Sequence, residues 1–186
     1  MRTKDFDKQK RIKEATMSLF LKDGINGVSV SKIAREAGVS PATIYVYYEN
    51  KEDMLGELFS EYAHKSYNYL VRRVSPEMDA AQFVEALIRG TYTYALENEE
   101  IISFVEQCSS CPTLQETVCQ KDCFDDVFSL IHDYQDKGLI RRYSDDNIAA
   151  VLFAPVKLMA TNRRVCSDPD RELSELIEML QRMLLI

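Results

Sequence analysis

Apolar residues recur every three or four positions along most of the chain, which is the spacing of amphipathic α-helices. This pattern is interrupted at glycines, at prolines, and at Ser, Asp or Asn residues that favour helix N-termini. No segment alternates apolar and polar residues in the manner of a half-buried strand. The sequence therefore predicts an all-α fold of about nine helices, at residues 8–23, 29–37, 41–47, 51–75, 79–97, 99–107, 112–138, 145–159 and 168–184.

Two of the predicted helices are short and are joined by a tight turn. Ser29 can accept a hydrogen bond from the first free N–H groups of one helix, and Gly38 can end that helix in the left-handed conformation. Ser40 and Pro41 are favoured at the start of the next helix. Two helices joined in this way are typical of the helix-turn-helix motif, whose second helix enters the major groove of DNA.

A wider set of spaced residues surrounds the motif within about the first 55 positions: Gly24, 28–30, Ile33, Ala34, 37–40, 43–45, Tyr47, Tyr48, Lys51 and Leu55. This set resembles the DNA-binding domain of the TetR/AcrR family of bacterial transcription regulators. The resemblance implies a DNA-binding head at residues 1–50 and a helical body at 51–186 that binds an effector and dimerises. It also implies that the protein binds a palindromic operator as a homodimer and acts as a repressor. A small-molecule effector is expected to release the homodimer from the operator.

The second helix of the motif offers few side chains to DNA. We expect Thr43 and Tyr47 to be its polar base readers, Tyr45 and Lys51 to bind phosphates, and Val46 to be able to contact a thymine methyl group. Ile44 and Tyr48 are expected to pack inward. The family often has a basic or polar residue followed by Gly where this chain has Pro41 and Ala42. The full predicted DNA-binding set is Ser29, Ser40, Pro41, Ala42, Thr43, Tyr45, Val46, Tyr47 and Lys51.

Charge is distributed unevenly along the chain. Residues 1–48 contain nine Lys or Arg and five Asp or Glu, a net charge of +4, whereas residues 49–186 carry −11, for a total of −7. A basic head on an acidic body can present one face to phosphates while the remainder repels them. In the first helix and the segment before it, where the family resemblance implies contacts to the DNA backbone, at least one of five basic residues is expected to contact phosphate, and the alternative is a merely solvated basic surface. The five residues are Lys4, Lys8, Lys10, Arg11 and Lys13.

Aromatic residues are frequent in the predicted helices of the body. At helical spacing most of them are expected in the core, but the family resemblance implies a ligand pocket in this region, and aromatic walls suit an apolar or aromatic effector. The candidate pocket residues are Tyr62, Tyr92, Tyr94, Phe104, Phe124, Phe128 and Tyr134.

The last two predicted helices are more apolar than a single buried face requires, which indicates an interface. The resemblance implies a four-helix dimer interface built from these helices of two protomers. The candidate interface residues are Val151, Leu152, Leu158, Met159, Leu173, Leu176, Ile177 and Leu180.

Four of the five cysteines lie close together, at Cys108, Cys111, Cys119 and Cys123. They could bind zinc, form a redox-sensitive disulfide, or serve as small buried apolar residues. The third interpretation is favoured, because a second C-x-x-C and a basic residue beside Cys108 or Cys111 are both missing. A thiol- or metal-responsive regulator is kept as the alternative function.

Motifs for enzymatic chemistry are not found. The chain contains no Gly-rich phosphate-binding loop, no H-E-x-x-H and no G-x-S-x-G, and His64 and His132 lack a Ser or Asp arrangement. We therefore expect neither an enzyme nor a cofactor or bound metal. With no export signal and no apolar run of the about 18 residues that a membrane span needs, the expected location is the cytoplasm.

Overall fold

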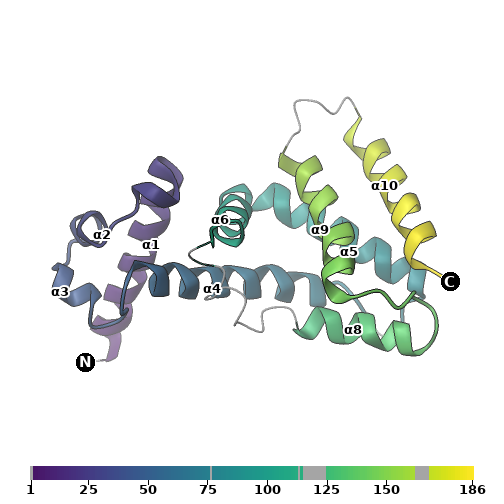
Figure 1. The fold of residues 1–186 in the computed structure, drawn as a ribbon, viewed down its shortest axis with the longest axis horizontal. Coiled ribbons are helices and arrows are strands. Elements are labelled where there is room, and N and C mark those ends of the chain that lie inside the picture. Colours follow the sequence, from purple (N-terminus) through teal and green to yellow (C-terminus); the bar gives the residue numbers. More distant parts are fainter. Residues whose placement is uncertain (1, 76, 113, 115–124, 162–167) are drawn as a thin grey trace. The chain divides into compact units, whose positions relative to one another are not determined.

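The computed structural model describes residues 2–75, 77–112, 114, 125–161 and 168–186, and in this part of the chain the all-α prediction is confirmed (Figure 1). The described residues form nine named helices and no named strand. The helices are α1 (Arg2–Gly27), α2 (Val30–Ala37), α3 (Pro41–Ile44), α4 (Lys51–Val71), α5 (Ala80–Glu97), α6 (Glu99–Ser109), α8 (Asp125–Asp136), α9 (Asp145–Thr161) and α10 (Pro169–Leu184).

Several helix boundaries differ from those expected. Helix α1 begins at Arg2 rather than near residue 8, although Gly24 breaks it as predicted, with φ of 68°. Helix α3 ends at Ile44 rather than at residue 47. Its last turn is closed early, because the N–H groups of Tyr47 and Tyr48 both bond to the Ile44 carbonyl, at 2.9 and 3.0 Å. The helix predicted at 112–138 is described as α8 from Asp125 onward, and residues 115–124 lie outside the described part.

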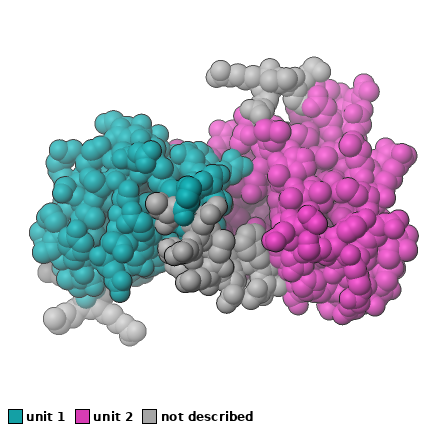
Figure 2. Space-filling model, viewed as in Figure 1, with its two compact units in different colours: residues 1–62, 103–122 teal, residues 63–102, 123–186 magenta. Residues whose placement is uncertain are grey.

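The chain divides into two compact units (Figure 2). The first comprises residues 1–62 and 103–122, and the second comprises 63–102 and 123–186. Helices α4 and α6 contribute residues to both units. The functional division at residue 50 remains a prediction, since these units are defined by packing alone.

The first unit is organised around α1. Ile12 and Phe20 of α1 are buried, as are Ile33 of α2 and Ile44 of α3. Phe20 also meets Phe104 of α6 edge to face, with ring centroids 4.8 Å apart. Burial of a large aliphatic or aromatic side chain contributes about 1.5–3 kcal/mol. These contacts therefore fix the short helices α2 and α3, which are too short to be stable alone.

The core of the second unit is formed by one face each of α5, α8, α9 and α10 with the end of α4. Two side-chain hydrogen bonds join elements far apart in sequence. Gln181 Nε2 donates to the Ala81 carbonyl at 2.9 Å, and the Tyr134 hydroxyl donates to the Met78 carbonyl at 2.7 Å. Both bonds attach a C-terminal element to the start of α5.

Candidate DNA-binding site

The turn between α2 and α3 has the geometry that its residues predict. Ser29 Oγ accepts from the Lys32 N–H at 3.4 Å, and Ser40 Oγ accepts from the Thr43 N–H at 3.2 Å. Between these caps Gly38 has φ of 65°, in the left-handed region that disfavours residues with a Cβ atom. The local sequence thus directs α3 away from α2 at a defined turn.

Two of the basic residues that are candidates for phosphate contact have partners inside the first unit. Arg11 Nη1 donates to the Ala37 carbonyl at 3.0 Å, which satisfies the C-terminal end of α2. Lys13 Nζ lies 3.0 Å from a carboxylate oxygen of Glu57 and 2.8 Å from one of Glu61. The expectation of a phosphate contact by at least one of the five basic residues stays a prediction, and for these two residues any such contact would add to the partners that they have inside the protein.

Burial alone would lower the pKa of Lys13, but the hydrogen bonds and charges of Glu61 and Glu57 outweigh it and hold the pKa above its usual value. Lys13 therefore stays charged at neutral pH, and its ion pairs join α1 to the first half of α4.

The predicted DNA-binding residues differ in how far they are exposed. Two of them, Tyr45 and Val46, are large side chains open to solvent, while Ile44 and Tyr48 are buried as expected. The remaining members fall into an exposed group and a half-buried group. Ser29, Ser40, Pro41 and Ala42 are exposed, and Thr43, Tyr47 and Lys51 are half-buried.

Four of these polar side chains, Ser40, Thr43, Tyr47 and Lys51, have partners in the protein. The Thr43 and Ser40 hydroxyls lie 2.9 Å apart, and the Lys51 amine lies 3.8 Å from the Glu52 carboxylate. The Tyr47 hydroxyl donates to Asp5 Oδ1 at 2.8 Å. This last hydrogen bond raises the pKa of Tyr47. Asp5 was not predicted as a site residue, because no local pattern connects two positions 42 residues apart.

An N-capped helix, a left-handed glycine turn and a second short helix with exposed side chains define a helix-turn-helix DNA-binding protein. Residues 12–58 match the family model described as bacterial regulatory proteins, tetR family. An uncharacterized HTH-type transcriptional regulator of Haemophilus influenzae strain Rd is 30% identical over 152 residues, which cover 78% of each chain. The chain therefore belongs to the TetR family of transcriptional regulators, as its sequence resemblance predicted.

Two further relatives extend the comparison beyond the head. The biofilm operon icaADBC HTH-type negative transcriptional regulator IcaR of Staphylococcus epidermidis is 22% identical over 140 residues, covering 75% of this chain and 71% of IcaR. The crystal structure of a TetR family transcription regulator from Marinobacter aquaeolei VT8 has a TM-score of 0.79 at 22% identity, covering 100% of this chain and 99% of that one. This likeness shows that the fold extends over the whole chain.

The described members of the predicted pocket set are distributed over both units. Tyr62 and Phe104 belong to the first unit, where their rings meet edge to face at 5.7 Å. Tyr134 belongs to the second unit, where it stacks on Phe83 at 4.3 Å in the core. Tyr94 belongs to a smaller cluster of that unit, and Tyr92 packs against both that cluster and the core that contains Tyr134. Phe124 lies outside the described residues. The shared aromatic pocket stays a prediction.

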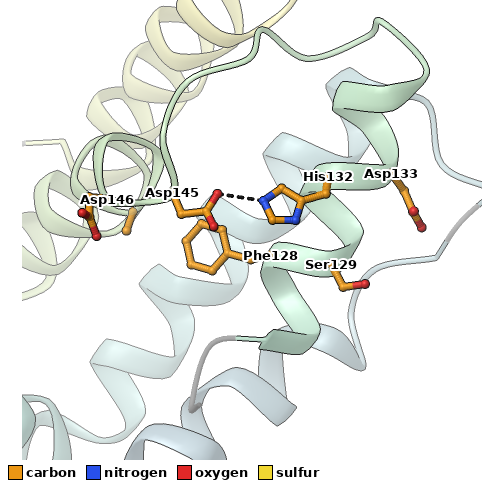
Figure 3. Close-up of a pocket in the computed structure, with 7 residues that line it drawn as sticks. Phe128, Ser129, His132, Asp133, Asp145 and Asp146 are labelled. Carbon is orange, nitrogen blue, oxygen red and sulfur yellow. Dashed lines mark hydrogen bonds and ion pairs between the residues drawn. The ribbon is translucent and has the colours of Figure 1, made fainter. Parts of the chain in front are cut away.

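A surface pocket of about 520 Å³ does occur in the second unit, between α8 and the start of α9 (Figure 3). Among the described members of the predicted set, only Phe128 lines it. A hydrogen bond of 2.8 Å between His132 Nε2 and Asp145 Oδ1 crosses it, and Asp133 and Asp146 add further carboxylates. Its lining combines Phe128 and Ala149 with charged and polar side chains, unlike the aromatic lining expected for an apolar effector.

The predicted interface residues divide between two faces of their helices. Leu152 of α9 and Leu173, Ile177 and Leu180 of α10 are buried in the core of the protomer, so they cannot supply an interface. Leu158 is exposed, and Val151, Met159 and Leu176 are half-buried. Sequence reasoning missed Met179 and Met183, which are exposed on α10. Met179 and Met183 follow Leu176 by three and seven residues, and this spacing could have shown that the three share one side of the helix.

The cysteine alternative gains no support. Cys108 is fully buried, and burial, followed by the nearby Cys111, raises its pKa to about 12. Such a thiol is a poor metal ligand and a poor nucleophile at neutral pH. Within the described ranges, no group of three or more His, Cys, Asp or Glu side chains could bind a metal ion. Cys119 and Cys123 lie outside those ranges.

Among the helices described, none is both long enough and apolar enough to cross a membrane.

Proposed function

We propose that this regulator is a repressor that binds a palindromic operator as a homodimer and is released by a small-molecule effector. The observation that carries the proposal is the capped helix-turn-helix, which leaves Tyr45 and Val46 exposed beside the short α3. The similarity to IcaR, a negative transcriptional regulator, supports repression. In this proposal residues 1–50 bind DNA, and residues 51–186 dimerise and bind the effector.

Dimerisation is supported by a second apolar stripe on α10. The first stripe, Leu173, Ile177, Leu180 and Leu184, is buried in the protomer. The second, Leu176, Met179 and Met183, lies on another side of the helix and is half-buried or exposed. Isolated exposed apolar residues are ordinary, but a stripe of them marks an interface. We place the proposed two-fold interface on this stripe together with Leu158 of α9.

Met179→Lys tests this interface. The side chain is 66% exposed, so the substitution leaves the fold of the protomer intact while it places a charge in the proposed contact. We expect sedimentation equilibrium to show at least a tenfold weaker dimer. Leu139→Lys, at an exposed apolar position outside α9 and α10, is the matched control. A dimer that is equally stable in both variants contradicts this placement.

Specific DNA binding is tested by a mobility shift with DNA that flanks the gene for this protein. Lys51→Ala is expected to weaken binding to all sequences and to lower the salt slope by about one, because one phosphate contact is lost. Thr43→Ala is expected to relax preference at one base position. Equal effects of the two substitutions on specificity would refute this division of roles, and the absence of any specific complex at moderate salt would refute operator binding.

Release by an effector requires that the effector bind the two states with different affinities. Helix α4 contributes residues to both units, so a displacement along it can connect the body to the head through one continuous element. If a ligand that binds the body leaves operator affinity unchanged, this part of the proposal fails.

A further inference from the structure

Asp5, in the first turn of α1, controls what the Tyr47 hydroxyl can recognise. A tyrosine hydroxyl has one O–H donor and oxygen lone pairs that accept. An ionised carboxylate only accepts, so in the 2.8 Å contact with Asp5 the donor is the Tyr47 O–H. The one proton that Tyr47 can donate is therefore already in use, and its lone pairs alone remain for DNA.

This restriction excludes one class of DNA group and selects another. Phosphate oxygens and the O6, N7 and O4 atoms of guanine and thymine are acceptors, so they cannot pair with an oxygen that offers only lone pairs. The exocyclic amino groups of adenine and cytosine are donors that point into the major groove. We infer that Asp5 makes Tyr47 an acceptor in the DNA complex, so that Tyr47 reads an adenine or cytosine amino group and does not bind a phosphate.

Charge and position support the same assignment. Asp5 carries a negative charge next to Tyr47, and this charge disfavours approach of a phosphate at that point. The negative charge of Asp5 is itself stabilised, because Asp5 lies in the first turn of α1, where the positive end of the helix favours an anion. The hydrogen bond to Asp5 raises the pKa of Tyr47, which agrees with a hydroxyl that keeps its proton and donates it to Asp5.

Tyr45 provides the contrast within the same short segment. It is exposed, and within the described part of the chain its hydroxyl makes no hydrogen bond. Its O–H can therefore donate to a phosphate oxygen. Two tyrosines separated by one residue thus take different roles, and the difference arises from Asp5, which lies 42 residues before Tyr47.

The inference rests on the proposed operator binding and is tested on the full-length protein by selecting binding sites from a random DNA library. Three variants are compared with the wild type: Asp5→Ala, Tyr47→Phe and the double substitution. Asp7→Ala is the matched control, because it removes an exposed negative charge two residues further along α1. Affinities for the selected site and for its single-base variants are then measured at one salt concentration.

At one position the wild type is expected to favour adenine or cytosine over guanine or thymine by about three- to tenfold, the contribution of a single hydrogen bond. Tyr47→Phe removes this preference by weakening binding to adenine or cytosine. Asp5→Ala removes it differently, by strengthening binding to guanine or thymine, since the freed O–H can donate. In the double variant, Asp5→Ala causes no further change in base preference at that position once Tyr47→Phe is present. Asp7→Ala leaves the preference of the wild type intact.

Three results overturn the inference. The first is that Asp5→Ala retains the preference of the wild type. The second is that Tyr47→Phe relaxes a position where the wild type prefers guanine or thymine, which would mean that Tyr47 donates to DNA. The third is that Tyr47→Phe relaxes no position. If the wild type selects no motif at all, the proposed function fails instead, so the two failures are distinguishable.

Discussion

Replacing Lys13 by Met tests the ion pairs that join α1 to α4 in the first unit. The substitution keeps the length and the apolar stem of the side chain and removes only the charge and its donors. Lys13 is 23% exposed, and the side chains of Glu57 and Glu61 are 40% and 37% exposed. The pairs are therefore neither fully buried nor freely solvated.

The loss of folding stability expected for Lys13→Met lies between two known limits. Exposed pairs contribute about 0–1 kcal/mol, whereas removing one partner of a buried pair costs about 3–5 kcal/mol. Lys13 makes two hydrogen-bonded ion pairs, and without it Glu57 and Glu61, one helical turn apart, repel each other by a few tenths of a kcal/mol. We expect Lys13→Met to destabilise the protein by about 2 kcal/mol, or to lower Tm by roughly 4–8 °C.

Thermal unfolding followed by circular dichroism measures this loss. The matched control is Lys10→Met on the same helix, whose amine lies 3.8 Å from Glu14 with both side chains more than 60% exposed. That variant is expected to change stability by less than about 0.5 kcal/mol. If both variants lose the same stability, the pairs of Lys13 are no more stabilising than an exposed pair and the reasoning is wrong.

The pH dependence of protein stability provides a second test of the ion pairs of Lys13. The pKa of Lys13 is higher in the folded protein than in the unfolded chain, where it is about 10.4. Its contribution is therefore fully present below about pH 10 and declines as the pH rises through the folded-state pKa. The difference in stability between wild type and Lys13→Met should stay constant from pH 7 to about pH 9.5 and narrow only above that range.

Two further predictions concern close packing and burial. A Cβ atom at Gly90 would lie 3.0 Å from Leu70 Cδ2 and 3.3 Å from Arg73 Cδ. Overpacking should outweigh the gain in helix propensity, so Gly90→Ala should destabilise the protein by about 1 kcal/mol, as measured by urea denaturation. A more stable variant would show that the Leu70 side chain moves to make room for the methyl group. Cys108, with its pKa raised to about 12, should resist iodoacetamide at pH 8 until the protein is denatured, as peptide mapping would reveal. Labelling of the native thiol at the rate of a free cysteine would contradict its burial.

The helix-turn-helix could be predicted because its signals are local. Gly38, Ser40 and Pro41 act on the backbone within two or three residues, so their conformational preferences survive in any tertiary context. The structure confirms the caps of both short helices and the left-handed glycine between them. The early end of α3 was less predictable, because helix ends depend on competition between hydrogen-bond patterns of similar energy.

The roles of charged residues could not be predicted in the same way. Arg11 and Lys13 are basic residues of α1 in a basic head, and their charge together with the family resemblance makes them candidates for phosphate contact. Their hydrogen bonds to the end of α2 and to α4 instead depend on which side of α1 faces the protein. Asp5 is the converse case, since an acidic residue was not expected at the DNA-binding side until its contact with Tyr47 was seen.

Helix α10 shows why periodicity alone could not distinguish the proposed interface from a buried face. It carries two apolar stripes, and both satisfy the helical spacing that indicates a buried face. The buried stripe consists of Leu and Ile, whereas the other stripe contains Leu176 and two methionines, Met179 and Met183, whose side chains are more flexible. Methionine adapts to irregular surfaces at low cost, so its position on one stripe favours a contact with a second molecule over packing in a fixed core. The residue type within each stripe therefore carries information that its spacing does not.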